Sequence, residues 1–413
     1  MLGAARGLAA LTSSPLEPSP GEPSPGAPSP GGPLPGMPPF APGWPSWNGG
    51  WPRSKAGQAE AARIARALAS LEPGAPSPEA FRAAVLRRLW RQDAALLRGL
   101  AAYRRHPHLR ALSDPPVLWS EGSARLLDYG GKGRPVLFVP SLVNRHYVLD
   151  LDEGASLMRH LAGRGFRPLL LDWGWPGPVE RRFTLTDHIA GRLERALTAA
   201  PAGLVLAGYC MGGLLALAAA LRRPDRVAAL ALLATPWDFS ADPQAGGLAR
   251  LLPGLEPLME PAGALGVDML QSLFAMLDPY AIPEKFRAFS RLDPAGDRAR
   301  RFVALEDWLN DGVPLPAPVA RETLGGWYGE NAPARGAWAV AGLPVLPRDW
   351  RGPAFVAIPA RDRIVPPGSA LPLAAAIPGA VTHVAQAGHI GMVAGQGAEA
   401  ALWRPLGDWL AAL

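Results

Sequence analysis

The feature that most constrains the fold is a strand–turn–helix pattern around the only cysteine of the chain. Residues 204–209 are apolar, as in a buried strand, and residues 214–221 form a Leu/Ala-rich helical segment. Between them, residues 208–212 read Gly-Tyr-Cys-Met-Gly, and the glycines permit a turn tight enough to present one side chain at the edge of a sheet. The positive end of the following helix and a nearby histidine would both favour the thiolate of Cys210. The pattern therefore predicts a nucleophile elbow, and the alternative is a small residue packed in a tight turn.

Apolar strands alternate with helices on both sides of this elbow. We expect further strands at residues 135–139, 167–171, 227–234, 355–359 and 381–385, and helices at 153–163, 184–200 and 398–413. Such alternation indicates a mostly parallel sheet with helices on both faces. Together with the elbow it predicts an α/β fold of the α/β-hydrolase type.

The chain divides into segments of different composition. Residues 1–50 repeat Pro, Ser and Gly, cannot bury apolar surface, and are expected to stay extended without a packed fold. Residues 51–115 are helical in pattern, with a break at 73–78. The expected core covers residues 116–237 and 346–413. Between its two parts, Pro-rich turns, short helical pieces and several aromatic residues predict an inserted cap at 238–345.

Composition argues against several classes of function. The net charge of +6 comes almost wholly from arginines that are scattered singly or in pairs, which disfavours nucleic-acid binding, although a modest basic field would attract an anionic coenzyme A ester. A lone cysteine forms no intrachain disulfide, and a free nucleophilic thiol favours the cytoplasm. Residues 203–221 are uncharged, but their glycines fit the elbow better than a membrane span. No signal peptide, transmembrane helix or metal-ligand spacing is expected.

An acid and a base follow the late strands in the order that this fold requires. Asp362 comes just after the strand at 355–359, and His389 just after the strand at 381–385. The order nucleophile, acid, histidine predicts a Cys210–Asp362–His389 triad. Asp238, after the strand at 227–234, is the rival acid. His383 falls within an apolar strand and is expected to be structural.

The oxyanion hole requires two backbone N–H groups directed at the developing negative oxygen. Met211, directly after the nucleophile, is expected to supply one. The other is expected from the loop after the strand at 135–139, with Val143 or Leu142 as the donor.

Several motifs of the chain resemble those of one enzyme family, the polyhydroxyalkanoate (poly-3-hydroxybutyrate) synthases, and are closest to the class III catalytic subunits. The matching segments are residues 142–151, 172–176, 208–213, 308–312, 362–366 and 388–391. By this resemblance Cys210, Asp362 and His389 correspond to the catalytic residues of enzymes that polymerise 3-hydroxyacyl-coenzyme A into storage polyester. The chain departs from the family at Arg363, where histidine is common, and in its Pro-rich first fifty residues.

The resemblance implies an acyltransferase with a Cys-bound acyl intermediate, and a coenzyme A thioester as substrate rather than a cofactor. The implied partners are 3-hydroxyacyl-coenzyme A, a growing polyester chain or granule surface, and a second copy in a homodimer, with a different synthase subunit as the alternative. The expected location is the cytoplasm, including the surface of polyester granules. Two other functions stay open: a Cys-dependent esterase or thioesterase with the same triad, and a non-catalytic granule-associated homologue.

Overall fold

The computed structural model describes residues 55–70, 77–241, 246–278 and 281–413. The predicted extended tail therefore lies outside the described residues. The chain divides into two units, Met1–Leu97 and Arg98–Leu413. Within the first unit are α2 (Lys55–Ala69) and most of α3 (Pro78–Arg105), in agreement with the two helices expected on either side of the break at 73–78.

Within the described residues of the second unit, eight strands form one sheet in the order β1-β2-β6-β3-β7-β8-β13-β14. The six strands from β6 to β14 are parallel, whereas β1 and β2 form an antiparallel hairpin on the β6 edge. The strands are β1 (Val117–Glu121), β2 (Ala124–Asp128), β3 (Pro135–Val139), β6 (Arg167–Asp172), β7 (Leu204–Tyr209), β8 (Val227–Leu233), β13 (Ala354–Pro359) and β14 (Val381–Ala385).

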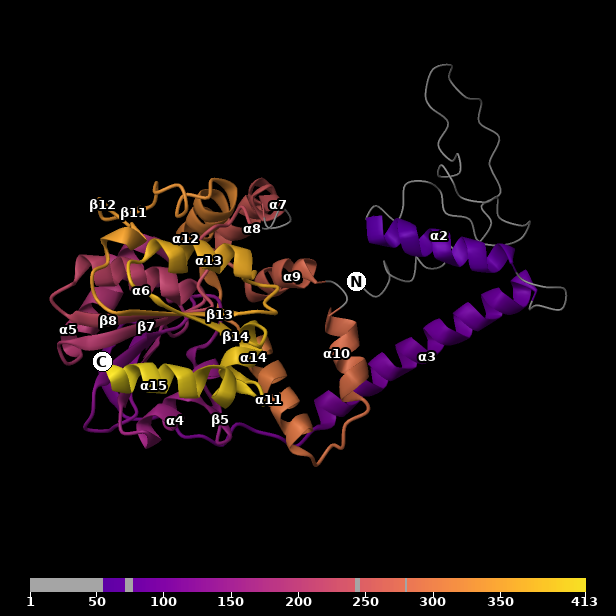
Figure 1. The fold of residues 1–413 in the computed structure, drawn as a ribbon, viewed down its shortest axis with the longest axis horizontal. Coiled ribbons are helices and arrows are strands. Elements are labelled where there is room, and N and C mark those ends of the chain that lie inside the picture. Colours follow the sequence, from indigo (N-terminus) through magenta and orange to yellow (C-terminus); the bar gives the residue numbers. More distant parts are fainter. Residues whose placement is uncertain (1–54, 71–76, 242–245, 279–280) are drawn as a thin grey trace, which may run out of the picture. The chain divides into compact units, whose positions relative to one another are not determined.

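Helices cover both faces of this sheet (Figure 1). One face carries α6 (Met211–Arg222) and α13 (Pro367–Ala376), and the other carries α4 (Leu157–Gly163), α14 (His389–Ala394) and α15 (Arg404–Ala412). Two apolar clusters fill the spaces between sheet and helices. The side chains of β7 alternate between them, since Leu204 and Leu206 belong to the first and Val205 and Ala207 to the second. The fold is thus the expected α/β arrangement with a mostly parallel sheet.

Between β8 and β13 the chain forms short elements, which we call the cap segment (residues 238–345). Its elements are α7 (Gly246–Ala249), α8 (Leu252–Ala262), β9 (Ala264–Leu265), α9 (Val267–Leu277), α10 (Ala281–Phe289), α11 (Asp297–Asn310), β10 (Leu315–Pro316), α12 (Ala317–Arg321), the π-helix η4 (Glu322–Gly329), β11 (Ala339–Val340) and β12 (Leu343–Pro344).

The structure differs locally from the sequence expectations in three places. The helix expected at 153–163 begins only at Leu157, because Ser156 accepts a hydrogen bond from Arg159 N as its N-cap and β4 (Asp150–Asp152) pairs with β5 (Ala155–Ser156) before it. The helix expected at 184–200 begins as a π-helix, η3 (Asp187–Leu193), and continues as α5 (Glu194–Ala199). The β1–β2 hairpin was not expected, since β1 is mostly exposed and lacks a regular apolar pattern.

Candidate active site

The backbone at Cys210 adopts a sharp turn between β7 and α6. Cys210 has φ 56° and ψ −130°, a conformation that costs a non-glycine residue free energy and is characteristic of functional sites. Its N–H donates to Leu233 O at 2.8 Å, which ties the turn to β8. A Cβ on Gly212 would lie 2.1 Å from Val139 O, and a Cβ on Gly208 would lie 2.4 Å from Gly213 Cα. The glycines of the elbow are therefore required by the close approach of neighbouring backbone.

Asp362 and His389, which follow β13 and β14, are in direct contact. The Oδ2 atom of Asp362 lies 2.6 Å from Nδ1 of His389. The other carboxylate oxygen, Oδ1, accepts hydrogen bonds from the backbone N–H groups of Ile364 at 2.8 Å and Val365 at 2.9 Å. Both side chains are buried. These bonds orient the carboxylate and direct it at the imidazole ring.

Cys210 lies close enough to His389 to act on the pKa of its ring, so the structure brings the three predicted residues together. Burial lowers the pKa of His389, but the charge of a Cys210 thiolate and the bonds to Asp362 and Cys210 outweigh it and raise the pKa from 6.5 to about 10. Tyr209 packs against the histidine: its hydroxyl donates to His389 O at 3.2 Å, and the centroids of the two rings lie 5.1 Å apart. The arrangement can hold an imidazolium beside a thiolate.

The rival acid, Asp238, has other partners. Its Oδ1 accepts hydrogen bonds from the backbone N–H of Ser240 at 2.9 Å and from Asn331 Nδ2 at 2.8 Å. The hydrogen bonds of Ser240 lower the pKa of Asp238. Asp238 thus closes a turn, and the geometry favours Asp362 as the acid of the triad.

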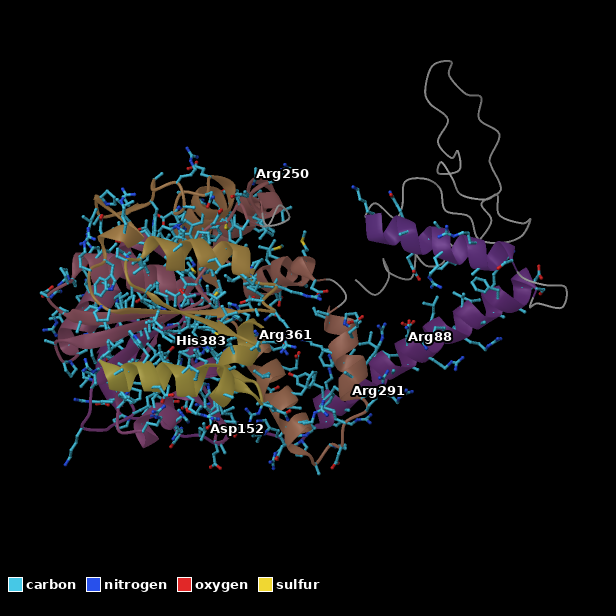
Figure 2. The ribbon with its side chains drawn as sticks, in the orientation of Figure 1. Arg88, Asp152, Arg250, Arg291, Arg361 and His383 are labelled. Atoms are coloured by element: carbon cyan, nitrogen blue, oxygen red, sulfur yellow. The ribbon has the colours of Figure 1, made fainter. Side chains whose placement is uncertain are left out.

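His383 lies within β14 and is labelled in Figure 2. Its Nε2 atom is 2.7 Å from Ala401 O, and its ring stacks on Phe355 with centroids 5.8 Å apart. These contacts are those of a structural residue.

The two predicted oxyanion donors face the same cavity as Cys210. Met211 opens α6, and both Met211 and Val143 line this cavity, whereas Leu142 lines a different one. The N–H of Val143 makes a long contact of 3.3 Å with Ser141 Oγ. The geometry therefore favours Val143 over Leu142, and both donor assignments stay predictions.

The cavity over Cys210 is apolar and has an empty volume of about 790 Å³. Among the residues that the structure describes, none with a charged side chain lines it. In its aromatic wall, Phe239 packs edge to face on Tyr328, with the ring centroids 4.8 Å apart. The lining residues come from the core loops (Ser141, Val143, Cys210, Met211, Pro236, Ile364, Val365) and from the cap segment (Phe239, Leu248, Leu265, Leu270, Leu273, Phe274, Leu315, Thr323, Leu324, Trp327, Tyr328). Such a space suits an acyl chain bound to Cys210.

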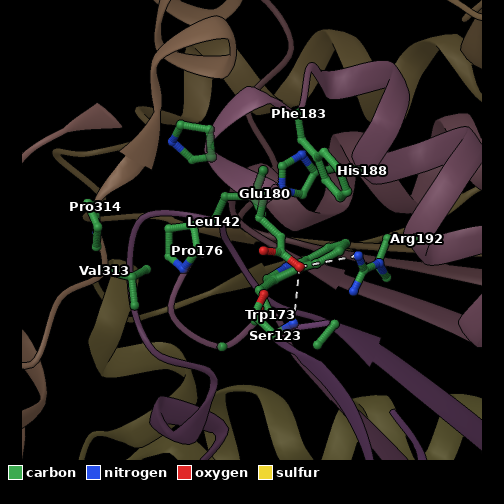
Figure 3. A pocket seen from close by; sticks show the side chains of 13 residues that line it. Ser123, Leu142, Trp173, Pro176, Glu180, Phe183, His188, Arg192, Val313 and Pro314 are labelled. Atoms are coloured by element: carbon green, nitrogen blue, oxygen red, sulfur yellow. Dashed lines mark hydrogen bonds and ion pairs between the residues drawn. The ribbon is translucent and has the colours of Figure 1, made fainter. Parts of the chain in front are cut away.

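A second, smaller cavity of about 350 Å³ lies between β2, η3 and the cap segment and contains none of the triad (Figure 3). Glu180 accepts hydrogen bonds there from Ser123 N at 3.1 Å and from Arg192 at 3.3 Å. Burial lowers the pKa of His188 to about 4, so its ring is neutral. The buried charges pair with each other, and we assign this cavity no catalytic role.

Among the residues that the structure describes, no cluster of three His, Cys, Asp or Glu side chains is placed to hold a metal ion. Over the same residues, none of the helices combines the length and apolar character that crossing a membrane requires.

Sequence reasoning missed one support of the site, the Tyr209 hydroxyl that bonds His389 O, and it also missed the ion pair that the exposed Arg363, next to Asp362, forms with Asp278. Tyr209 stands inside the elbow motif, but nothing in the motif tells which way its ring points. Asp278 is 85 residues from Arg363 in the chain, so no local pattern connects them.

Comparison with known proteins places these observations in a family context. Residues 134–395 match the alpha/beta hydrolase fold family. The chain is 28% identical over 360 residues to a poly(3-hydroxyalkanoate) polymerase subunit of Haloferax mediterranei, covering 81% of this chain and 72% of that protein. It is also 28% identical over 295 residues to the polymerase subunit of the same name from Synechocystis sp., covering 67% and 77%. A solved alpha/beta hydrolase fold protein from Nakamurella multipartita matches 73% of this chain and 99% of its own, with 19% identity and a TM-score of 0.46.

Proposed function

Since the chain belongs to the alpha/beta hydrolase fold family, we propose that it uses this fold for acyl transfer: it polymerises 3-hydroxyacyl-coenzyme A into polyhydroxyalkanoate and releases coenzyme A. The similarity to poly(3-hydroxyalkanoate) polymerase subunits over most of the chain supports the substrate class. The single observation that carries the mechanism is the contact of His389 with both Cys210 and Asp362.

In the first step, the Cys210 thiolate attacks the thioester carbonyl of the substrate. A bond forms between Sγ and the acyl carbon, and the negative oxygen is held by the N–H groups of Met211 and Val143. When the oxyanion collapses, the bond to the coenzyme A sulfur breaks and that sulfur takes the proton of His389. One thioester has replaced another, so the acyl group keeps its transfer potential.

In the second step, neutral His389 removes the proton from the 3-hydroxyl of an incoming monomer or chain end. The hydroxyl oxygen bonds to the acyl carbon, the bond to Sγ breaks, and the thiolate of Cys210 is regenerated beside an imidazolium. Asp362 orients the ring and stabilises its positive charge throughout.

Chain growth requires that water be kept away from the acyl-enzyme. The apolar walls of the Cys210 cavity support this, because Phe239, Trp327 and Tyr328 form a contiguous aromatic cluster above the elbow. A site that admitted water freely would release hydroxy acid instead.

The proposed reaction uses the thioester as substrate and needs no further cofactor. The relatives are named polymerase subunits, which supports an assembly, and we propose a homodimer, with a different second subunit as the alternative. We also propose that the protein is cytoplasmic and binds the surface of polyester granules. Sedimentation of the purified chain and fractionation of polyester-containing cells test these points.

Incubation of the purified protein with 3-hydroxybutyryl-coenzyme A tests the proposed function directly. Release of coenzyme A together with oligomer or polymer is the expected result. Release of coenzyme A with only free 3-hydroxybutyrate would identify a thioesterase. No release at all, with an intact Cys210, would identify a non-catalytic homologue.

A further inference from the structure

The loop after β3, residues 140–147, which we call the oxyanion loop, is fixed from two sides by side chains that lie outside the catalytic triad. We infer that the indole N–H groups of Trp173 and Trp308 position the Val143 N–H for the oxyanion of acyl transfer. This inference rests on the proposed function, because it takes Val143 as an oxyanion donor. Neither tryptophan lines the Cys210 cavity, so both act as positioning residues rather than catalytic ones.

The first anchor comes from the end of β6 and holds the start and the end of the loop. Trp173 Nε1 donates to Pro140 O at 3.1 Å, three residues before Val143. The Nδ1 atom of His146, three residues after Val143, lies 2.9 Å from Asp172 Oδ1. Both members of this His–Asp pair are buried. Residues at the end of β6 therefore contact the oxyanion loop on both sides of Val143.

The second anchor comes from the end of α11, in the cap segment. Trp308 Nε1 donates to Arg145 O at 2.8 Å. Just beyond it, the Tyr147 hydroxyl donates to Asp311 Oδ2 at 3.0 Å. The backbone of Asn144 also pairs with that of Gly312 in an antiparallel bridge. Residues 144–147, directly after the donor, are thus joined to a segment more than 160 positions away in the sequence.

The burial of these indole donors makes the anchors rigid. Trp308 is only 3% exposed and Trp173 only 9%, so neither indole N–H can easily exchange its carbonyl partner for water. An oxyanion donor acts only when it lies about 2.7–3.1 Å from the developing negative oxygen. Val143 itself makes only the long contact with Ser141 Oγ, which does not fix its direction well. The position and direction of the Val143 N–H must therefore be fixed by the contacts of Trp173 and Trp308 with the neighbouring residues of the loop.

The test uses two reactions of the same thiol that differ in their need for an oxyanion hole. Acylation of Cys210 by 3-hydroxybutyryl-coenzyme A, followed as the first burst of coenzyme A, passes through an oxyanion. Alkylation of Cys210 by iodoacetamide forms a sulfur–carbon bond and expels iodide without one, yet it depends on the same Cys210 and His389. If the tryptophans position the Val143 N–H, their loss should slow acylation and leave alkylation unchanged. General damage to the fold would slow both reactions.

The variants are Trp308→Phe and Trp173→Phe, which remove the N–H donor and keep most of the ring. Trp350→Phe is the matched control, because Trp350 is also buried and its Nε1 also donates to a backbone carbonyl, that of Pro353 at 3.3 Å, before β13 begins. Loss of a whole oxyanion donor lowers the catalytic rate by about 10²- to 10³-fold. Displacement of the Val143 N–H in either test variant should therefore slow acylation by about tenfold. Alkylation rates should stay within about twofold of the wild type for all three variants, and Trp350→Phe should acylate normally.

Equal losses in both reactions, or no loss of acylation in either test variant, would overturn the inference. Wild-type protein that releases no coenzyme A would instead count against the proposed function. In that case acylation by p-nitrophenyl butyrate, which also forms an oxyanion, replaces the thioester and the same comparison decides the role of the two tryptophans.

Discussion

Nδ1 of His389 lies 2.6 Å from Oδ2 of Asp362, and the second oxygen of the same carboxylate is occupied by two backbone N–H groups. The carboxylate therefore has no freedom to rotate away from the imidazole. This relationship specifies which ring nitrogen faces the acid and leaves Nε2 directed towards Cys210.

Asp362→Asn should permit a first burst of coenzyme A and then stall. A thiol beside a histidine is already a fair nucleophile, whereas deprotonation of a hydroxyl needs a strong and correctly oriented base. An amide stabilises the wrong tautomer of His389, so elongation should slow by about 10³-fold or more. Rapid-quench measurement of coenzyme A and product length checks this. Asp238→Asn is the control and should be nearly unaffected; the reverse ranking would transfer the acid role to Asp238.

Cys210→Ala should abolish turnover, and Cys210→Ser should leave at most a slow activity, because a hydroxyl is far harder to deprotonate than a thiol. In the wild type, mass spectrometry after brief exposure to a 3-hydroxyacyl-coenzyme A should find the acyl group on the peptide that contains Cys210. Turnover with an unmodified Cys210 would refute its role as the nucleophile.

Cys210→Gly should be more stable than Cys210→Ala by about 1 kcal/mol, the reverse of the usual order of these residues. The reason is the positive φ of 56° at this position, which glycine adopts without strain. Urea unfolding of the two inactive variants measures the difference. A more stable alanine variant would show that the elbow stores no backbone strain.

The stability of the protein should fall as the pH rises from 6.5 towards 10. Folding raises the pKa of His389 from 6.5 to about 10, so the folded state gains from protonation, fully below pH 6.5 and progressively less up to about pH 10. Asp362→Asn removes one of the groups that raise this pKa and should flatten the slope. Unfolding free energies of both proteins across this range test the prediction, and parallel curves would contradict it.

Deletion of residues 1–50 should leave stability and initial coenzyme A release close to those of the full chain. These residues are rich in Pro, Gly and Ser and nearly free of charge, so they have little to bury against the core. Thermal unfolding and the burst assay on both chains make the comparison. A large loss of either property would mean that the tail docks on the catalytic unit.

The parallel part of the sheet was predictable because the strands inside it are buried on both faces and read as continuous apolar runs, while the exposed edge strand β14 follows the last apolar helix and keeps a short Val-containing run. β3 and β14 begin and end at the predicted residues, and β6, β8 and β13 differ from prediction by one residue at one end. The β1–β2 hairpin escaped because an exposed antiparallel edge has no such apolar run. The predicted start of the helix at 184 agrees with the structure, in which Thr184 and Asp187 bond each other reciprocally as a capping box.

In the site, chain order was enough to propose Cys210, Asp362 and His389, because the ends of parallel strands meet at one edge of a sheet. The contacts of Trp173 and Trp308 with the oxyanion loop could not be predicted from the sequence. Trp308 and Arg145 are 163 positions apart, and their bond depends on where the cap segment returns to the core. No local pattern encodes that return.

Cys210 lines an apolar cavity and is the only cysteine in the chain. Labelling of this thiol can therefore measure the number of accessible active sites. A thiol-specific fluorophore can bind one site per chain, so labelling stoichiometry reports the fraction of molecules whose cavity is open and whose thiol is free. An environment-sensitive dye would also report solvent entering beneath Trp327 and Tyr328. Purified preparations can thus be standardised by active-site titration rather than by mass.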